Sequence, residues 1–467
     1  MDCGCDASCI NDCNTEAEIT MKITVLGGGE SGVGAARLAQ SKGYKVLLSD
    51  NGEIKEKYKN VLSNHGIEFE EGGHTLDRIF GSEVVVKSPG IPDTIPLIHS
   101  LEEKGIYPIS EIEFAYKHCN GKIIAITGSN GKTTTTMLTY HILESAGLDV
   151  RMAGNVGASF AGQLTDGDHD YWVLELSSFQ LDGIVDFKPH IAVLLNITPD
   201  HLDRYDYKFE NYVASKFRIA MNQDENDHFI YWAHDQVISE ELSKHDLKSQ
   251  LLPFGIGKKP EGEDWVGAWN EEERLHIKTN NNYFDMSIHD LALQGRHNVF
   301  NSMASSLNGR VLDLRKEVVR ESLSNFENAE HRLEHVARVA GISFVNDSKA
   351  TNINSTWYAL ESIDGPVIWI AGGVDKGNDY SELFDLVDGR VRALICLGTD
   401  NKKLHEAFEG RIDTIVDALS ADEAVRVAYD LGYKNDTVLL SPACASFDLF
   451  ENYEERGHAF KAAVKRL

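Results

Sequence analysis

Residues 122–134 read KIIAITGSNGKTT, and this stretch decides the fold of the central part of the chain. An apolar, β-branched strand runs into a glycine-rich turn, and a helical pattern starts at Lys132. Such a turn lets backbone N–H groups face a phosphate chain, and the helix start adds positive potential. Lys132 would neutralise nucleotide phosphates, and the Thr133 hydroxyl could bind Mg²⁺. Gly128 lies closer to Gly131 than in the standard G-x4-G-K-[ST] motif, but the coincidence of these features predicts a nucleotide-binding loop.

Short apolar runs alternate with helical patterns from Met21 onward, which is typical of βαβ units and parallel sheets. We therefore expect an α/β fold in three blocks, over residues 21–117, 118–329 and 330–467. The predicted strands lie near 22–27, 44–49 and 83–87 in the first block, 122–127, 171–176, 190–196 and 228–232 in the second, and 342–346, 366–371, 392–397 and 436–441 in the third.

Composition excludes several classes of protein. The 467 residues are 42% hydrophobic and 25% charged, the profile of a globular chain rather than a disordered or fibrous one. The net charge of −28 argues against general binding to nucleic acid or to an anionic membrane surface. Because no run of 18 apolar residues occurs, we expect no membrane insertion.

The cysteines divide into two groups. Three are scattered, and the absence of a secretory signal pattern favours a reducing cytoplasm. The other four crowd into residues 1–20, an acidic segment without periodic pattern, which we expect to be a disordered leader or the product of an upstream start codon before Met21. A metal or redox cluster in that segment is the alternative. The scattered cysteines are Cys119, Cys396 and Cys444, and the crowded ones are Cys3, Cys5, Cys9 and Cys13.

A second glycine-rich turn, GGGESG over residues 27–32, follows the first predicted strand. It satisfies G-x-G-x-x-G, and Asp50 closes the next strand, as in dinucleotide-binding proteins. The same turn could hold another nucleotide diphosphate, or serve only close packing of helix on strand. Glu30 places a carboxylate near the position of such a diphosphate.

Polar residues also follow the strands of the other two blocks. Glu175 ends one strand and His201 follows another, and these residue types suit a divalent metal beside phosphates. In the third block, residues 346–352, 372–377 and 441–448 each follow a strand and carry Lys, Ser or Thr. Because carboxyl ends of parallel strands share one sheet edge, we expect a crevice there for an anionic substrate.

Eight stretches, met in order between Met21 and Leu467, make the chain resemble the Mur ligases of peptidoglycan synthesis. The SSFQ and SPACAS runs point to the members that add D-glutamate, and the DNPR run of the diaminoacid-adding members is absent. The stretches are TGSNGKTT (127–134), GNVG (154–157), ELSSFQL (175–181), DHLDRY (200–205), GRHN (295–298), HRLE (331–334), NDSKAT (346–351) and SPACAS (441–446).

The resemblance implies a Rossmann-like N-terminal domain for the UDP moiety, a central P-loop ATPase-like domain and a Rossmann-like C-terminal domain. It implies that ATP phosphorylates the carboxylate of UDP-N-acetylmuramoyl-L-alanine and that the amine of D-glutamate attacks the acyl phosphate. It also implies two Mg²⁺ ions, one held by Thr133 and Glu175 and one by His201. Lys216 matches a lysine that CO₂ converts to a metal-binding carbamate. We expect a cytoplasmic monomer that acts on small molecules.

By the same resemblance, the catalytic set is Lys132, Asn155, Glu175, His201 and Lys216. The implied ATP contacts are Gly128, Ser129, Asn130, Gly131, Lys132, Thr133, Thr134, Asn298, Asn301, Arg332 and Asp347. The implied contacts to the UDP substrate are Ser31, Asp50, Ser88, Gly90 and Asn155. The implied D-glutamate contacts are Lys349, Thr351, Lys376, Ser446 and Phe447.

Three other functions compete. A dinucleotide-dependent oxidoreductase explains the turn at residues 27–32 but leaves the loop at 128–134 idle. A regulatory ATPase explains Lys132 but not the loops of the third block. A Mur ligase that adds another amino acid is the alternative within the family.

Overall fold

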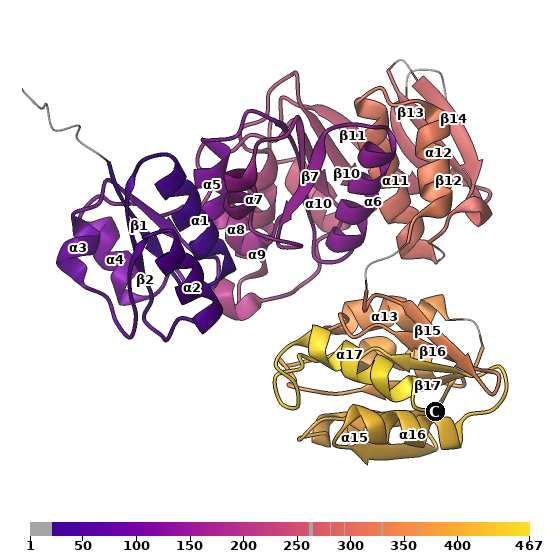
Figure 1. The fold of residues 1–467 in the computed structure, drawn as a ribbon. Coiled ribbons are helices and arrows are strands. Elements are labelled where there is room, and N and C mark those ends of the chain that lie inside the picture. The colour runs from indigo at the N-terminus through magenta and orange to yellow at the C-terminus, as the bar shows by residue number, and fades with distance from the viewer. Residues whose placement is uncertain (1–20, 261–264, 281, 294, 328–329, 364) are drawn as a thin grey trace, which may run out of the picture. The chain divides into compact units, whose positions relative to one another are not determined.

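The computed structural model of the protein describes residues 21–260, 265–280, 282–293, 295–327, 330–363 and 365–467 (Figure 1). The expected leader and its four cysteines lie outside the described residues. The described part contains three sheets, and each is mainly parallel. The predicted strands are all confirmed, within two residues at either end. The three-domain α/β architecture is therefore the one expected.

The first sheet is parallel throughout, in the order β3-β2-β1-β4-β5. Its strands are short, apolar and mostly buried, and five helices connect or flank them. The strands are β1 (Lys22–Leu26), β2 (Lys45–Ser49), β3 (Glu68–Glu70), β4 (Val84–Lys87) and β5 (Ile109–Ser110), and the helices are α1 (Glu30–Ser41), α2 (Glu56–Asn64), α3 (Leu76–Phe80), α4 (Pro96–Glu103) and α5 (Glu111–Tyr116).

One helix of this compact unit comes from later in the sequence. The unit takes the chain up to His118 together with Ser159–Gly167, which contains α7 (Phe160–Asp166). α1 and α7 approach closely at Gly34, where a Cβ atom would meet the Ser159 Oγ at 2.1 Å. The Ala161 N–H donates to the buried Glu111 carboxylate, which ties α7 to α5. Glycine at position 34 is thus required by the packing of the two helices.

The second compact unit, Cys119–Ala158 with Asp168–Leu467, holds the other two sheets. The larger has the order β14-β13-β12-β11-β10-β9-β6-β8-β7. Its strands are β6 (Lys122–Thr127), β7 (Val150–Gly154), β8 (Tyr171–Glu175), β9 (Ile191–Leu194), β10 (His228–Trp232), β11 (Gln250–Ile256), β12 (Gly267–Glu271), β13 (Arg274–Thr279) and β14 (Asn282–Ser287).

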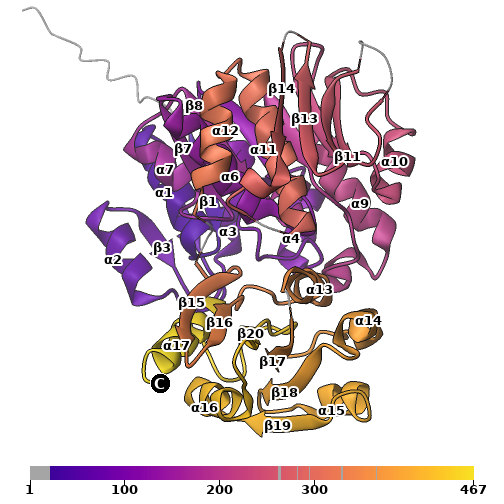
Figure 2. The same ribbon diagram turned by 90° about the vertical axis from the view of Figure 1, so that its right-hand side faces the viewer.

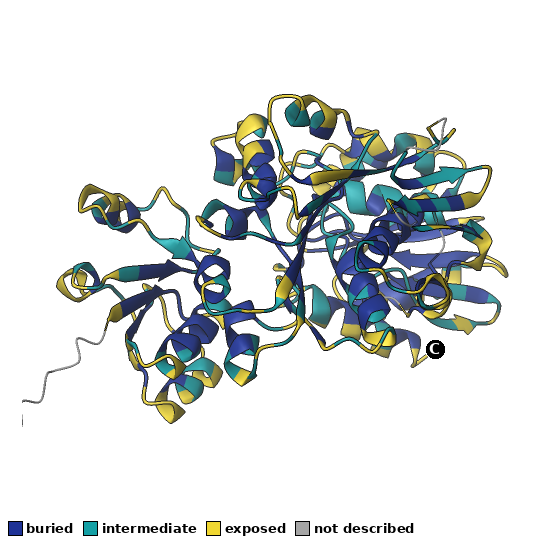
Figure 3. Ribbon diagram, turned by 90° about the horizontal axis from the view of Figure 1, so that it is seen from above, coloured by how far each residue is buried: buried dark blue, intermediate teal, exposed yellow. Residues whose placement is uncertain are grey.

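Helices α6 (Lys132–Ser145), α11 (Arg296–Val311) and α12 (Lys316–Asn325) share one apolar core with the strands of this sheet. The middle strands β6, β8 and β9 are buried along most of their length, in the dark blue of Figure 3. The antiparallel ladder of β12 to β14 extends the sheet. The remaining elements are α8 (Ser178–Asp182), α9 (Phe209–Phe217), α10 (Gln236–Leu242) and the 3-10 turns Leu202–Tyr205, Arg218–Ala220 and Ile288–Asp290.

The third sheet has the order β15-β16-β20-β17-β18-β19, and only β15 is antiparallel to its neighbour. One core lies under α13 to α15 and another under α16 and α17, which flank the sheet on opposite sides (Figure 2). The elements are β15 (Glu334–Val339), β16 (Ile342–Asn346), α13 (Ile353–Ser362), β17 (Val367–Ala371), the 3-10 turn Tyr380–Leu383, α14 (Phe384–Val387), β18 (Val391–Leu397), α15 (Lys402–Phe408), β19 (Thr414–Ala418), α16 (Ala421–Leu431), β20 (Thr437–Leu440) and α17 (Tyr453–Val464).

Across the described residues, every helix is too short or too polar to cross a lipid bilayer.

Candidate active site

The loop between β6 and α6 has the shape of an anion site. Gly131 caps the helix with a φ of 83°, in the left-handed region that favours glycine. The loop is pinned to the segment after β9, because Asn196 accepts hydrogen bonds from the Asn130 and Ser129 N–H groups, at 2.8 and 2.9 Å. The Lys132 ammonium donates to the carbonyl oxygens of Gly128 and Ser129, each at 2.8 Å. Lys132 thus lies against the loop that it is expected to serve.

The loop is also fixed to helix α11. A Cβ atom on Gly131 would meet the Asn301 Oδ1 at 2.5 Å. That oxygen accepts a hydrogen bond from the Thr135 hydroxyl at 3.2 Å, and the Asn301 Nδ2 donates to the Asn298 Oδ1 at 3.3 Å. The two predicted nucleotide-contacting amides are therefore oriented by the first turns of α6.

A pocket opens beside this loop and encloses about 670 Å³ of space, part of it open to solvent. Aromatic and aliphatic side chains form part of its wall and polar side chains form the rest, a combination that suits a planar ligand with polar substituents. Burial and the nearby Arg332 lower the pKa of His297 to about 4, so this imidazole is neutral at neutral pH. The lining residues include Trp232, Phe254, Phe300, Tyr358, Asn130, Gly131, Thr134, Asn298, Asn301, Arg332 and Asp347.

Asp347 closes the pocket from the third sheet. Its carboxylate accepts hydrogen bonds from the Leu333 N–H at 3.2 Å and the Ser441 hydroxyl at 2.9 Å. Burial raises the pKa of Asp347 to about 7, and the Arg332 guanidinium opposes that rise. The predicted ATP residues of both sheets thus converge on one pocket.

Glu175 and Asn155 form a second part of the site. The Asn155 Nδ2 donates to the Glu175 Oε1 at 2.8 Å, whereas the buried Oε2 has no hydrogen-bond partner among the described residues. The carboxylate raises the pKa of Lys132 against a larger lowering by burial. Because a buried carboxylate oxygen without a partner is costly, a divalent cation fits this position.

The other predicted metal residues differ in their surroundings. Thr133 is buried in the first turn of α6. His201 has a φ of 51° and a partly exposed side chain, and its ring meets the edge of Phe179 at 5.2 Å between centroids. Burial lowers the pKa of His201, which favours the neutral imidazole that metals bind.

Lys216 is buried behind the nucleotide loop. Its Nζ donates to the Gly128 carbonyl at 2.9 Å and lies 4.7 Å from the centre of the Tyr212 ring. Burial, helped by the charge of Lys132, lowers the pKa of Lys216 well below its ordinary value. The side chain is thus held close to Lys132 as a weakly basic amine.

The predicted D-glutamate residues fall into two groups. Thr351 and Lys376 line one crevice, which is partly open to solvent and is also lined by the predicted metal ligand His201. Lys349 lies 5.4 Å from the centre of the Tyr453 ring, and burial beside Arg332 lowers its pKa to about 8. Ser446 is buried, whereas Phe447 is 70% exposed and does not line the crevice.

Arg456 on α17 was not anticipated from the sequence, because no motif marks it. Its buried guanidinium makes five hydrogen bonds to the loops that follow β16, β17 and β20. The acceptors are oxygens of Ser348, Gly372 and Cys444. Arg456 therefore fixes the three strand-end loops relative to one another.

In the first unit, the residues predicted for the UDP substrate surround the turn at 27–32. Asp50 accepts hydrogen bonds from the N–H groups of Gly28 at 2.5 Å and Gly52 at 2.7 Å. The Ser88 Oγ lies 2.7 Å from where a Gly27 Cβ would be and has no hydrogen-bond partner among the described residues. The other two positions, Ser31 and Gly90, are half-buried and exposed.

The chain is similar to known proteins along almost its whole length. Residues 22–95 match the MurD N-terminal domain, 126–308 the Mur ligase middle domain, and 331–444 the Mur ligase glutamate ligase domain. The UDP-N-acetylmuramoylalanine–D-glutamate ligase of Christiangramia forsetii is 56% identical over 446 residues, which cover 96% of this chain and 99% of that protein. The enzyme of that name from Porphyromonas gingivalis is 53% identical, over 95% and 98% of the two chains.

Among solved structures, the UDP-N-acetylmuramate-alanine ligase of Thermotoga maritima has the same fold. The TM-score is 0.61 at 20% sequence identity, over 96% of this chain and 99% of that one.

Proposed function

The chain belongs to the UDP-N-acetylmuramoylalanine–D-glutamate ligase family, and on that premise we propose that it joins D-glutamate to UDP-N-acetylmuramoyl-L-alanine in peptidoglycan precursor synthesis. ATP transfers its γ-phosphoryl group to the alanyl carboxylate, and ADP leaves. The D-glutamate amine then attacks the acyl phosphate, loses a proton and releases phosphate as the amide forms. A dehydrogenase or a regulatory ATPase would not need a second ligand crevice, with Thr351 and Lys376 in its wall, in the same compact unit as the nucleotide loop.

The observation that carries this proposal is the meeting of three features in one compact unit. The loop at 128–134 can hold phosphates, and the aromatic pocket beside it can hold a base. The crevice offers the Lys376 ammonium and the Thr351 hydroxyl to an acidic amino acid, among the carboxylates of Asp200, Asp203, Asp379 and Glu382. The proposed reaction needs ATP and the D-glutamate amine in one unit of the protein, and these features supply a site for each. We assign residues 21–117 to the UDP moiety, 118–329 to ATP, and 330–467 to D-glutamate and part of the ATP site.

Each charged residue has a distinct task in this proposal. The Lys132 ammonium offsets repulsion between the phosphates and the attacking carboxylate. Arg332 and Asp347 contact the phosphates and the ribose from the third sheet. Lys349 and Lys376 bind the two carboxylates of D-glutamate. Thr351, Ser446 and Phe447 belong to the same pocket, although the Phe447 side chain lies outside the crevice. Ser31, Asp50, Ser88, Gly90 and Asn155 contact the UDP substrate.

Thr133 and Glu175 would hold one Mg²⁺ ion and His201 a second. Bound there, the ions would neutralise the phosphates and polarise the γ-phosphoryl group. The unpartnered Oε2 of Glu175 supports the first position. The depressed basicity of Lys216 supports a carbamate, because only an unprotonated amine reacts with CO₂.

We also propose a cytoplasmic monomer. The described cysteines, Cys119, Cys396 and Cys444, are free thiols, which supports a reducing compartment. Equilibrium sedimentation of the purified chain tests the oligomeric state.

The proposal is tested by ADP release from the purified protein with UDP-N-acetylmuramoyl-L-alanine and each candidate amino acid in turn. We expect release that requires D-glutamate. Release that is independent of D-glutamate, or that L-lysine or diaminopimelate supports equally, would refute it. Carbamylation has its own readout: ¹³C-bicarbonate should give a carbamate resonance that Lys216→Met abolishes.

A further inference from the structure

Arg332 lies between two residues with unusual backbone conformations. His331 has a φ of 64° and Leu333 a φ of 46°, both in the left-handed region. A bulky residue such as leucine rarely occupies that region, and such strain persists only where surrounding contacts enforce it. The turn at residues 330–334 therefore needs contacts that brace it. This conformation of the turn places the Arg332 side chain in the nucleotide pocket.

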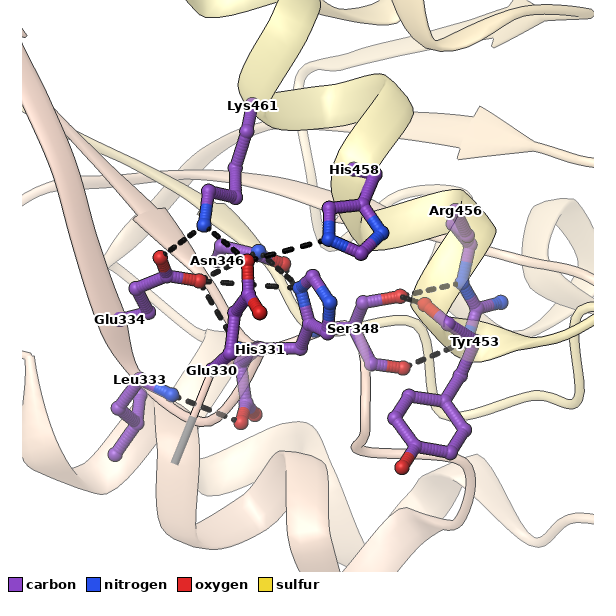
Figure 4. Close-up of polar contacts among 11 residues, drawn as sticks. Glu330, His331, Leu333, Glu334, Asn346, Ser348, Tyr453, Arg456, His458 and Lys461 are labelled. Carbon is purple, nitrogen blue, oxygen red and sulfur yellow. Dashed lines mark hydrogen bonds and ion pairs between the residues drawn. The ribbon is translucent and has the colours of Figure 1, made fainter. Parts of the chain in front are cut away.

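The brace comes from helix α17 (Figure 4). The Lys461 ammonium lies between two carboxylates of the turn, 2.6 Å from the Glu330 Oε1 and 2.5 Å from the Glu334 Oε1. The His458 Nε2 lies 3.2 Å from the same Glu330 oxygen. Lys461 is only 19% exposed, so solvent screens its ion pairs less than those of a surface lysine. Lys461 thus joins both ends of the turn to one helix.

The middle of the turn is fixed through Glu334 and Asn346. The Glu334 Oε2 accepts hydrogen bonds from the His331 N–H at 3.0 Å and from the Asn346 Nδ2 at 3.1 Å. The same Asn346 amide donates to the His331 Nδ1 at 2.8 Å. On the far side of Arg332, the Leu333 N–H donates to Asp347. Both residues that flank Arg332 therefore have their backbone N–H groups bound to carboxylates.

Helix α17 also fits the His331 ring closely. A Cβ atom on Gly457 would lie 2.2 Å from the His331 Nδ1, so only glycine leaves room for the ring. The ring packs edge-on against His458, with centroids 4.6 Å apart. The contact explains a glycine inside α17 that helix propensity would disfavour.

Glu330, His331 and His458 are close enough together to suggest a metal site. Two contacts argue against that reading. The Asn346 Nδ2 lies 2.8 Å from the Nδ1 of His331 and occupies that ring nitrogen, which is then not available to an ion. The Lys461 cation already occupies the space between the carboxylates. A brace explains all of these contacts.

We propose that Lys461 is a positioning residue of the ligase, which holds the turn at 330–334 so that the Arg332 guanidinium stays in the nucleotide pocket. The inference rests on the proposed function in one respect, because it takes the ligand of that pocket to be ATP. Lys461 acts through Arg332 and does not itself contact the nucleotide.

The experiment compares Lys461→Met with Lys465→Met in the full-length protein. Both changes remove one positive charge near the end of α17, but Lys465 is exposed and outside the brace. We expect Lys461→Met to weaken MgADP binding, measured by calorimetry, about fivefold, and to raise KM for ATP similarly while KM for D-glutamate stays unchanged. Lys465→Met should bind MgADP as the unmodified protein does, and Lys461→Arg should restore binding.

To distinguish a positioning role of Lys461 from a general structural role, the measurement of MgADP affinity is repeated in an Arg332→Ala background. There, Lys461→Met should cause no further loss of MgADP affinity, because the residue through which it acts is gone. A full fivefold loss in that background, or unchanged affinity of Lys461→Met in the native background, overturns the inference. If Lys461→Met does not fold, Glu334→Gln removes one ion pair of the brace and is judged by the same two outcomes. Failure of this inference can be told from failure of the proposed function. If the proposed function is wrong, ADP release does not require D-glutamate, whatever the MgADP affinities of these variants are.

Discussion

Gly131→Ala is the change whose cost the structure defines most fully. At a φ of 83°, an alanine is disfavoured by about 1–2 kcal/mol relative to glycine. Its Cβ would lie 2.5 Å from the Asn301 Oδ1, closer than side chains tolerate, so Asn301 must move. That movement breaks the hydrogen bonds of Asn301 with Thr135 and Asn298, at about 1 kcal/mol each. We expect a total loss of about 3–4 kcal/mol in the free energy of unfolding.

Gly147→Ala is the matched control at the other end of α6. Gly147 has a φ of 78°, and a Cβ atom there would meet nothing within 4 Å. The control therefore carries the backbone cost of about 1–2 kcal/mol and no steric cost. Both variants are compared by urea unfolding and by KM for ATP, which we expect to rise at least about tenfold in Gly131→Ala alone.

Equal losses of stability in the two variants would refute the steric part of this reasoning. An unchanged KM for ATP in a folded Gly131→Ala protein would refute the assignment of the loop to the nucleotide.

Other predictions concern single side chains. Glu175→Gln should lower kcat by about 10²-fold, while the melting temperature does not fall, because the Oε2 that is replaced has no partner among the described residues. Asp347→Asn should flatten the pH dependence of stability: with a pKa of about 7 in the folded state, Asp347 makes urea stability fall as pH rises from about 4 to 7, and the variant lacks that slope. Arg456→Lys should raise KM for D-glutamate more than KM for ATP, because a lysine cannot make the five hydrogen bonds to the acceptor loops.

Local patterns explain why so much of the fold could be predicted. The strand and turn at 122–134 carry their own signals, since β-branched residues, glycines and the helix start all lie within a few positions. The antiparallel strands β12 to β14 were not predicted from the sequence. Their polar and aromatic residues, among them Trp269, His276 and Tyr283, do not form the continuous apolar run that marks a buried parallel strand. The alternating polar and apolar pattern of a strand at a sheet edge is a weaker sequence signal than the apolar run of a strand that is buried on both faces.

In the candidate site, too, some residues could be predicted from local motifs and others only from the folded structure. Motifs anticipated polar residues that line the nucleotide pocket, such as Asn298 and Asp347, but neither its aromatic walls, formed by Trp232, Phe254, Phe300 and Tyr358, nor the groups that hold the polar residues in place. Asn196, Arg456 and Lys461 act through contacts between segments that are far apart in the sequence. The residues next to them in the sequence give no signal of these contacts. Burial of Lys216 is likewise a property of packing, because its helix reads as an ordinary amphipathic segment.

The inclusion of α7 in the first compact unit has a consequence for synthesis on the ribosome. The sheet of that unit is complete by Ser110, but the helix that packs on α1 at Gly34 ends only at Asp166. The other unit contributes the 40 residues Cys119–Ala158 in between. Translation from Ser110 to Asp166 takes about 3–11 s at usual rates. During that interval the face of α1 that receives α7 is uncovered, and an N-terminal fragment that stops at His118 lacks one segment of the first unit. Its stability is shared with a segment that lies beyond the nucleotide loop in the sequence.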